Sequence, residues 1–131
     1  MESNQKHDKL ILNNAPFGQL GLIPVSGCEK MGREIDYYLK QWRTERQHEH
    51  EDSPAFAGYQ RPTYIIDSKV PRFGTGEGKG VLYQSVRGMD LYILVDVVNY
   101  SEIYRMFSFD NHMSPDDHFQ NLKRVIAAVG G

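Results

Sequence analysis

Two stretches of the chain show apolar residues that recur every three or four positions, which is the spacing of an amphipathic helix. They run from about 29 to 42 and from about 115 to 129. The expected buried faces are Met31, Ile35, Tyr38, Leu39 and Trp42 in the first helix, and Phe119, Leu122, Val125, Ile126 and Val129 in the second. Ser114 and Pro115 predict a well-defined start for the second helix, because serine is a good N-cap and proline fits the first turn.

Three short apolar runs have the composition of β-strands. They are 22–25, 63–67 and 91–95, and the last lacks polar alternation, which is typical of a strand covered on both faces. A turn-rich stretch at 71–80 precedes an apolar run at 81–84 and predicts a hairpin. Together with the helices, these runs predict an α/β fold with a mainly parallel sheet flanked by helices and a β-hairpin excursion.

The chain reads as a single domain with two polar additions. A polar lead-in occupies residues 1–20, and a polar insertion occupies residues 43–62. A crossover helix usually leads to another strand, but no strand follows the second helix. We therefore expect residues 1–131 to be a fragment of a longer protein.

The composition argues against nucleic-acid and membrane partners and against a disulfide. The formal net charge is −2, so we expect no broad basic surface and no nucleic-acid partner. No apolar run approaches the roughly 18 residues of a membrane span, so we expect no membrane partner. Cys28 is the one cysteine, which rules out an internal disulfide and predicts a reducing, cytoplasmic location. A helix N-terminus beside Cys28 could lower its pKa, but a partly buried, inert thiol is the favoured interpretation.

The glycine-rich stretch from Arg72 to Glu77 is the first candidate binding element. In a functional interpretation, Phe73 stacks against a flat ring and Glu77 accepts hydrogen bonds from that ring. In the simpler interpretation, the stretch is a hairpin loop and Phe73 is a hydrophobic plug. Composition alone favours the simpler interpretation, because glycine-rich loops are common.

The second candidate element is Ser85-Val86-Arg87-Gly88. On an extended chain, Ser85 and Arg87 share one face, and the following glycine lets the backbone turn towards an anion. The alternative is a strand end with a surface arginine. Taken alone, this segment favours the alternative.

Histidines and aspartates suggest a metal site, but their setting argues against one. His48 and His50 lie in the most polar part of the chain, with no apolar frame to fix a geometry. Asp110, Asp116 and Asp117 could supply oxygen ligands to Mg²⁺, although the last two complement the helix dipole more simply. We therefore assign no metal ligand. Two further histidines are expected to be surface or capping residues: His112 and His118.

The order of these segments resembles the N-terminal half of the ribose-phosphate pyrophosphokinases (phosphoribosyl pyrophosphate synthetases). The residues 72–77 are similar to that family's Arg-Phe-x-Asp-Gly-Glu loop, and 85–94 are similar to its Ser-Val-Arg-Gly-x-Asp-Val-Tyr-Ile-Ile segment. Residues 22–27 resemble its first strand and Ser-Gly turn, and 115–119 resemble its helix start. The likeness covers most of residues 21–131.

The resemblance implies the first of two phosphoribosyltransferase-like domains in a homo-oligomeric enzyme. Such an enzyme, a ribose-phosphate diphosphokinase, transfers diphosphate from ATP to ribose 5-phosphate with Mg²⁺, for nucleotide biosynthesis. By position, Phe73, Thr75 and Glu77 would hold adenine in a neighbouring subunit's active site. Ser85 and Arg87 would line a regulatory site for phosphate or ADP at a subunit interface.

The chain also departs from the family. Thr75 replaces an aspartate of the adenine loop, and Val129-Gly130-Gly131 replaces a basic helix end. The family's catalytic segments belong downstream, so this chain holds no catalytic residue and is expected to be inactive alone. Two alternatives stay open: a noncatalytic regulatory or assembly homologue with the same fold, and a free-standing phosphate- or nucleotide-binding module.

Overall fold

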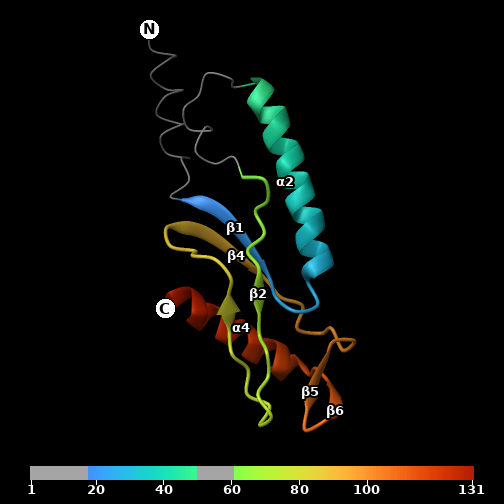
Figure 1. Ribbon diagram of the computed structural model, residues 1–131. Helices are drawn as coiled ribbons and strands as arrows, with labels where there is room; N and C mark the ends of the chain where they lie inside the picture. Colours follow the sequence, from blue (N-terminus) through green and yellow to red (C-terminus); the bar gives the residue numbers. More distant parts are fainter. Residues whose placement is uncertain (1–17, 50–60) are drawn as a thin grey trace.

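The computed structural model describes residues 18–49 and 61–131, and Figure 1 shows how their elements are arranged. The elements are β1 (Gln19–Pro24), α2 (Glu29–Glu49), β2 (Ser68–Lys69), β3 (Val81–Leu82), β4 (Met89–Leu94), β5 (Ile103–Met106), β6 (Phe109–His112) and α4 (Pro115–Gly130). The expected α/β class is confirmed, because two helices accompany a small parallel sheet. Predictions for residues 1–17 and 50–60, including most of the polar lead-in and insertion, lie outside the described residues.

β1 is the central strand of the parallel sheet. One of its edges pairs with β4 over the whole length of both strands. Its other edge meets the segment that returns from α2: Leu22 N–H donates to Tyr64 O, and Ile66 N–H donates to Leu22 O, both at 2.7 Å. The strand expected at 63–67 is reduced to this short contact. The pairs β2–β3 and β5–β6 are antiparallel, so a mainly parallel sheet is found only at the centre of the fold.

The two helices lie on opposite sides of the parallel strands (Figure 1). The fully buried core is on the side of α4 and consists of Ile23, Val25, Ile66 and Val125. α2 covers the other side of β1, where it lies against Pro24. The prediction that residues 91–95 are covered on both faces is wrong. Leu91 and Ile93 pack on the core, whereas Tyr92 is 62% exposed because α2 packs over β1.

The buried face of α2 differs from the face that its apolar residues predict. Met31, Tyr38 and Trp42 are all more than half exposed. Asp36 is buried in their place. A hydrophobicity pattern counts a carboxylate as an outward residue, and it therefore assigns the wrong orientation to this helix.

The face of α4 is shifted in the same way. His118 and Asn121 are buried beside Val125, whereas Phe119 and Ile126 are about half exposed. The prediction that His118 is a surface or capping residue is therefore wrong. Each of the two buried polar side chains has a hydrogen-bond partner from a distant segment, Arg72 for Asn121 and Asn99 O for His118. The Nδ1 atom of His118 is buried without a hydrogen-bond partner among the described residues.

The β5–β6 hairpin has no counterpart among the predicted elements. Its two-residue turn consists of Phe107 and Ser108, which have φ values of 49° and 69°. Positive φ at both central residues is usual in a tight hairpin, but glycine or asparagine normally occupies such positions. The sequence therefore lacks the signal by which this turn could have been recognised.

Asp36 joins α2 to the segment that pairs with β1. One carboxylate oxygen accepts from Tyr64 N–H at 2.6 Å, and the other is 2.8 Å from the ammonium nitrogen of Lys40. Burial alone would raise the pKa of Asp36. The hydrogen bonds from Lys40 and Tyr64 N–H outweigh that effect and hold the pKa below its ordinary value.

Substitution of this carboxylate should destabilise the fold in a pH-dependent way. We expect Asp36→Asn to lower the free energy of unfolding at pH 7 by about 2 kcal/mol, because a buried charged hydrogen bond is lost. The folded-state pKa of Asp36 is depressed, so its contribution is present above the unfolded value of about 3.9 and is lost as the pH falls through the folded value. Urea unfolding between pH 7 and pH 3 should therefore show the difference between the two proteins shrinking with acidification.

The matched control is Glu34→Gln on the same helix. Glu34 forms an exposed ion pair with Lys30 at 4.0 Å, and its loss should cost less than about 0.5 kcal/mol. Equal losses for the two variants would contradict the structural role assigned to Asp36.

Candidate functional site

The 72–78 loop, residues Arg72 to Gly78, is a tight hairpin at one end of the molecule (Figure 1). Phe73 N–H donates to Glu77 O at 2.9 Å, and Gly76 N–H donates to Phe73 O at 2.8 Å. Phe73 and Glu77 therefore lie opposite each other across the hairpin. The Phe73 ring is 55% exposed, and Thr75 and Glu77 are exposed as well. The structure thus brings the three expected adenine-binding residues together on one short, exposed loop.

Arg72 anchors this loop to the rest of the fold. Its side chain is only 9% exposed. The guanidinium donates to Gly76 O at 2.9 Å and to Asn121 Oδ1 of α4 at 2.7 Å, and it lies 4.8 Å from the centre of the Tyr104 ring of β5. Arg72 therefore holds the loop, α4 and the β5–β6 hairpin in one arrangement.

The β5–β6 hairpin supports the loop from a second side. Gly76 has a φ of +86°, and a Cβ atom there would lie 2.6 Å from Met106 Sδ. The backbone conformation at this position therefore favours glycine, and the Met106 side chain packs closely against it. The loop is fixed by packing as well as by hydrogen bonds.

Glu77 is paired with a cation that comes from α4. Arg124 Nη2 donates to Glu77 Oε1 at 3.1 Å, and both side chains are partly exposed. Just after the loop, the backbone at Gly80 packs directly against α4. A Cβ atom at Gly80 would collide with the carbonyl oxygen of Arg124. This close approach keeps Arg124 beside the loop. Hence the exposed hairpin presents the Glu77 carboxylate paired with a guanidinium from α4.

Ser85 and Arg87 belong to the turn that precedes β4. This turn lies away from the 72–78 loop (Figure 1). Both residues are exposed, and Arg87 N–H lies 3.5 Å from Ser85 Oγ. The expectation that they share one face of an extended strand is wrong, because Met89 N–H closes a turn on Val86 O at 3.2 Å. The structure does not bring this pair together with the loop.

His118 and Cys28 are buried at the carboxyl end of the parallel strands. His118 Nε2 is 2.7 Å from Asn99 O. A carbonyl oxygen only accepts, so Nε2 carries the proton and donates it. Burial raises the pKa of the Cys28 thiol, with a further contribution from the Asp96 charge, so a lowered pKa is contradicted and a buried, unreactive thiol is supported.

The aspartates near α4 have structural partners. Asp117 accepts from Ser114 N–H at 2.9 Å, and Ser114 Oγ accepts from Asp117 N–H, which forms a capping box and confirms the predicted helix start. Asp110 lies 4.0 Å from Arg105. Among the described residues, no group of three histidine, cysteine or carboxylate side chains could hold a metal ion. His50 and the side chain of His48 lie outside those residues.

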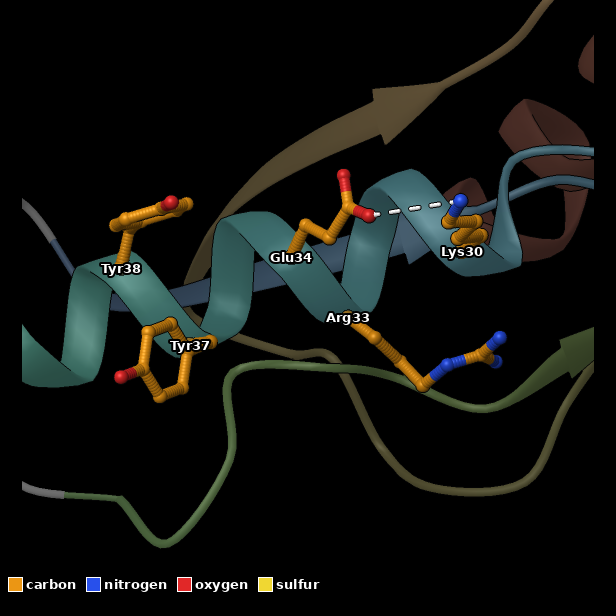
Figure 2. A pocket seen from close by; sticks show the side chains of 5 residues that line it. All are labelled: Lys30, Arg33, Glu34, Tyr37 and Tyr38. Carbon is orange, nitrogen blue, oxygen red and sulfur yellow. Dashed lines mark ion pairs between the residues drawn. The ribbon is translucent and has the colours of Figure 1, made fainter.

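A shallow depression lies on the outer side of α2 (Figure 2). Its lining residues all come from this one helix: Lys30, Arg33, Glu34, Tyr37 and Tyr38. Figure 2 shows these side chains spread over the outside of the helix, with one ion pair between Lys30 and Glu34. A surface built from a single helix does not enclose a small ligand. The 72–78 loop is therefore the stronger candidate site.

Comparisons with family models, with curated proteins and with solved structures produce no match to this chain. The site must therefore be interpreted from its own geometry. Neither helix of the described residues combines the length and the apolar character needed to cross a membrane.

Sequence reasoning missed the partners of the loop, namely Tyr104, Asn121 and Arg124. They lie 32 to 49 positions from the loop residues that they contact. No local pattern marks them, because asparagine and arginine on a helix ordinarily face solvent. The close contact at Gly80 could have suggested that α4 lies beside the loop, but the sequence does not say which residue it approaches.

Replacement of the anchor should loosen the site. We expect Arg72→Lys to lower the free energy of unfolding by about 2 to 3 kcal/mol, because an ammonium cannot reproduce the forked donors or the stacking on Tyr104. Chemical denaturation measures the loss, and limited proteolysis at the 72–78 loop should be faster. Arg87→Lys is the matched control at an exposed position and should change neither property. An unchanged stability for Arg72→Lys would contradict the anchoring role.

The environment of Cys28 predicts that its thiol reacts slowly in the native protein. In the native protein at pH 8, a thiol-specific aromatic disulfide reagent should react with Cys28 at least about tenfold more slowly than in urea, since the side chain is buried and its thiolate is disfavoured. Absorbance reports the reaction directly, because the sequence has one cysteine. Equal rates in the two conditions would show that the thiol is accessible.

Proposed function

We propose that this chain is the N-terminal domain of a ribose-phosphate pyrophosphokinase. The full enzyme would transfer diphosphate from ATP to ribose 5-phosphate, and this domain would supply a base-binding loop, a regulatory anion site and subunit contacts. The proposal rests first on the order of the sequence segments that resemble the family. The observation that best supports it is the 72–78 loop, which is rigidly held and yet exposes its aromatic ring.

The loop has the properties that a base-binding element needs. Phe73 offers an accessible ring for stacking, and stacking on a base contributes about 1 to 3 kcal/mol. Glu77 adds hydrogen-bond acceptors on the same hairpin, and Thr75 adds a hydroxyl. Because Arg72 fixes the hairpin in advance, little conformational entropy would be lost when a nucleotide binds.

The position of Ser85 and Arg87 is compatible with a second, separate anion site. They lie away from the 72–78 loop, so a phosphate held there would not compete with the base (Figure 1). Arg87 is exposed and could pair with a phosphate through two parallel hydrogen bonds. This separation supports a regulatory role for the pair more than a part in binding the substrate base.

Among the described residues, no group of three histidine, cysteine or carboxylate side chains could hold a metal ion, so we assign no Mg²⁺ ligand to them. Phosphoryl transfer depends on cations placed around the transferred group. In the proposed enzyme, these cations and the metal ligands would come from outside the described residues. This chain would bind and orient the nucleotide and would not perform the transfer alone.

Activity of the full-length protein tests the proposal. We expect formation of phosphoribosyl pyrophosphate that requires both ATP and Mg²⁺, measured by coupled consumption of the product. Phe73→Ala should raise KM for ATP at least about tenfold, because the stacking surface is removed. Phe119→Ala is the matched control, since Phe119 is similarly exposed on α4 and away from the loop residues, and it should leave KM unchanged.

Two outcomes would count against the enzyme. A folded full-length protein that forms no product would favour a noncatalytic regulatory or assembly homologue, an alternative that Thr75 also favours. An active protein in which Phe73→Ala behaves like Phe119→Ala would keep the reaction but remove the loop from nucleotide binding.

A further inference from the structure

The β5–β6 hairpin projects from the fold beside the start of α4, and one of its two faces is uncovered (Figure 1). Side chains alternate between the two faces of a strand. Tyr104 and Met106 turn inward, where they pack against Arg72 and Gly76. The residues that alternate with them form what we call the outer face, and all of them are exposed: Ile103, Arg105, Asp110 and His112.

Cross-strand pairing arranges the outer face in two rows. Ile103 lies directly opposite His112, and Arg105 lies directly opposite Asp110. The Arg105 and Asp110 side chains form an exposed ion pair at 4.0 Å. The His112 ring stacks on the Tyr100 ring, with 4.6 Å between the ring centres. The outer face therefore presents a row of apolar and aromatic groups beside a row with one charge of each sign.

The turn of the hairpin adds an aromatic residue in a conformation that asparagine or glycine would adopt with less strain. Phe107 has a φ of 49° and is 68% exposed. A bulky residue rarely occupies this left-handed region. Because Phe107 is so exposed, packing within the chain offsets little of the strain. A strained and exposed aromatic residue at the tip of a projecting hairpin indicates a contact with another molecule.

The charges of the outer face indicate which molecule that is. One cation lies opposite one anion, so the face is neutral and favours neither a nucleic acid nor an anionic membrane. The face is, however, complementary to itself. A twofold axis that runs parallel to the strands, between two outer faces, places β5 of one copy over β6 of the other. Arg105 then meets Asp110 of the other copy, and Ile103 meets His112 in the same way.

We propose that the outer face of the β5–β6 hairpin is a twofold contact between two copies of this chain, with Phe107 and Tyr100 as aromatic anchors. The inference goes beyond the proposed function, because the contact can form whether or not the 72–78 loop binds a nucleotide. Arg72 and Gly76 already hold the inner face, so little entropy is lost on association. Side chains of these sizes would bury on the order of 1,000 Å² in total, the lower limit for a specific interface.

Charge substitutions test the contact on the full-length protein. Sedimentation velocity follows the molar mass at protein concentrations from about 1 to 100 μM, a range suited to an interface of this size. Asp110→Arg leaves two cations on each outer face, and Arg105→Asp leaves two anions. Because like charges then face each other, each variant should need a concentration at least about tenfold higher to associate. An equimolar mixture of the two variants brings opposite charges together, and its association should recover.

Two further variants separate the contact from folding. Phe107→Asn suits the positive φ of the turn, so the urea midpoint should stay the same or rise, while association weakens by about tenfold because an anchor is lost. Lys30→Asp is the matched control and should leave association unchanged, since Lys30 also forms an exposed ion pair at 4.0 Å. Arg105 also donates to Ser108 O at 3.3 Å. If Arg105→Asp does not fold, Asp110→Arg and Phe107→Asn therefore decide the result.

The outcomes separate this inference from the proposed function. A wild-type protein that shows no self-association over this range overturns the inference and leaves the outer face to a different partner. Folded charge variants that associate like the wild type, or a mixture of them that fails to associate, overturn it as well. None of these results affects the formation of phosphoribosyl pyrophosphate. If association depends on the outer face and no product forms, the inference is supported and the proposed function is not.

Discussion

The arrangement of the candidate site depends on one buried cation. The Arg72 guanidinium reaches the loop backbone at Gly76 O, a side chain of α4 at Asn121, and an aromatic ring of β5 at Tyr104. Removing a guanidinium from water is costly unless its donors find acceptors, and here they do. Because these partners come from the loop, α4 and β5, the same contacts that offset the cost also fix the three elements relative to one another.

The consequence is a loop that is both exposed and rigid. A glycine-rich hairpin of this size would lose much conformational entropy on ordering. In this chain, Arg72 and the contact between Gly76 and Met106 have already ordered it. Phe73 and Glu77 can therefore be presented to a ligand from a fixed frame, and Arg124 joins them because Gly80 lets α4 approach closely. The Ser85–Arg87 turn depends on none of these contacts and forms a separate feature.

Sequence reasoning succeeded where the signal is local and failed where burial depends on distant partners. The helix starts and the central strands were predictable, since caps and apolar runs act within a few residues. The buried faces of the two helices were not predictable. Asp36 and His118 are buried because they form hydrogen bonds with segments that lie 28 and 19 positions away. The β5–β6 hairpin escaped prediction because Phe107 and Ser108 are not residues that usually form such a turn.

The same distinction applies to the site. Phe73, Thr75 and Glu77 could be selected from their order along the chain, but their chemistry is set by Arg124, which lies 47 positions from Glu77. The Glu77 carboxylate orients the Arg124 guanidinium, which has further N–H donors of its own. The hydrogen-bonding groups of the loop are therefore completed by a cation from a distant helix, and no pattern within the loop itself marks that cation.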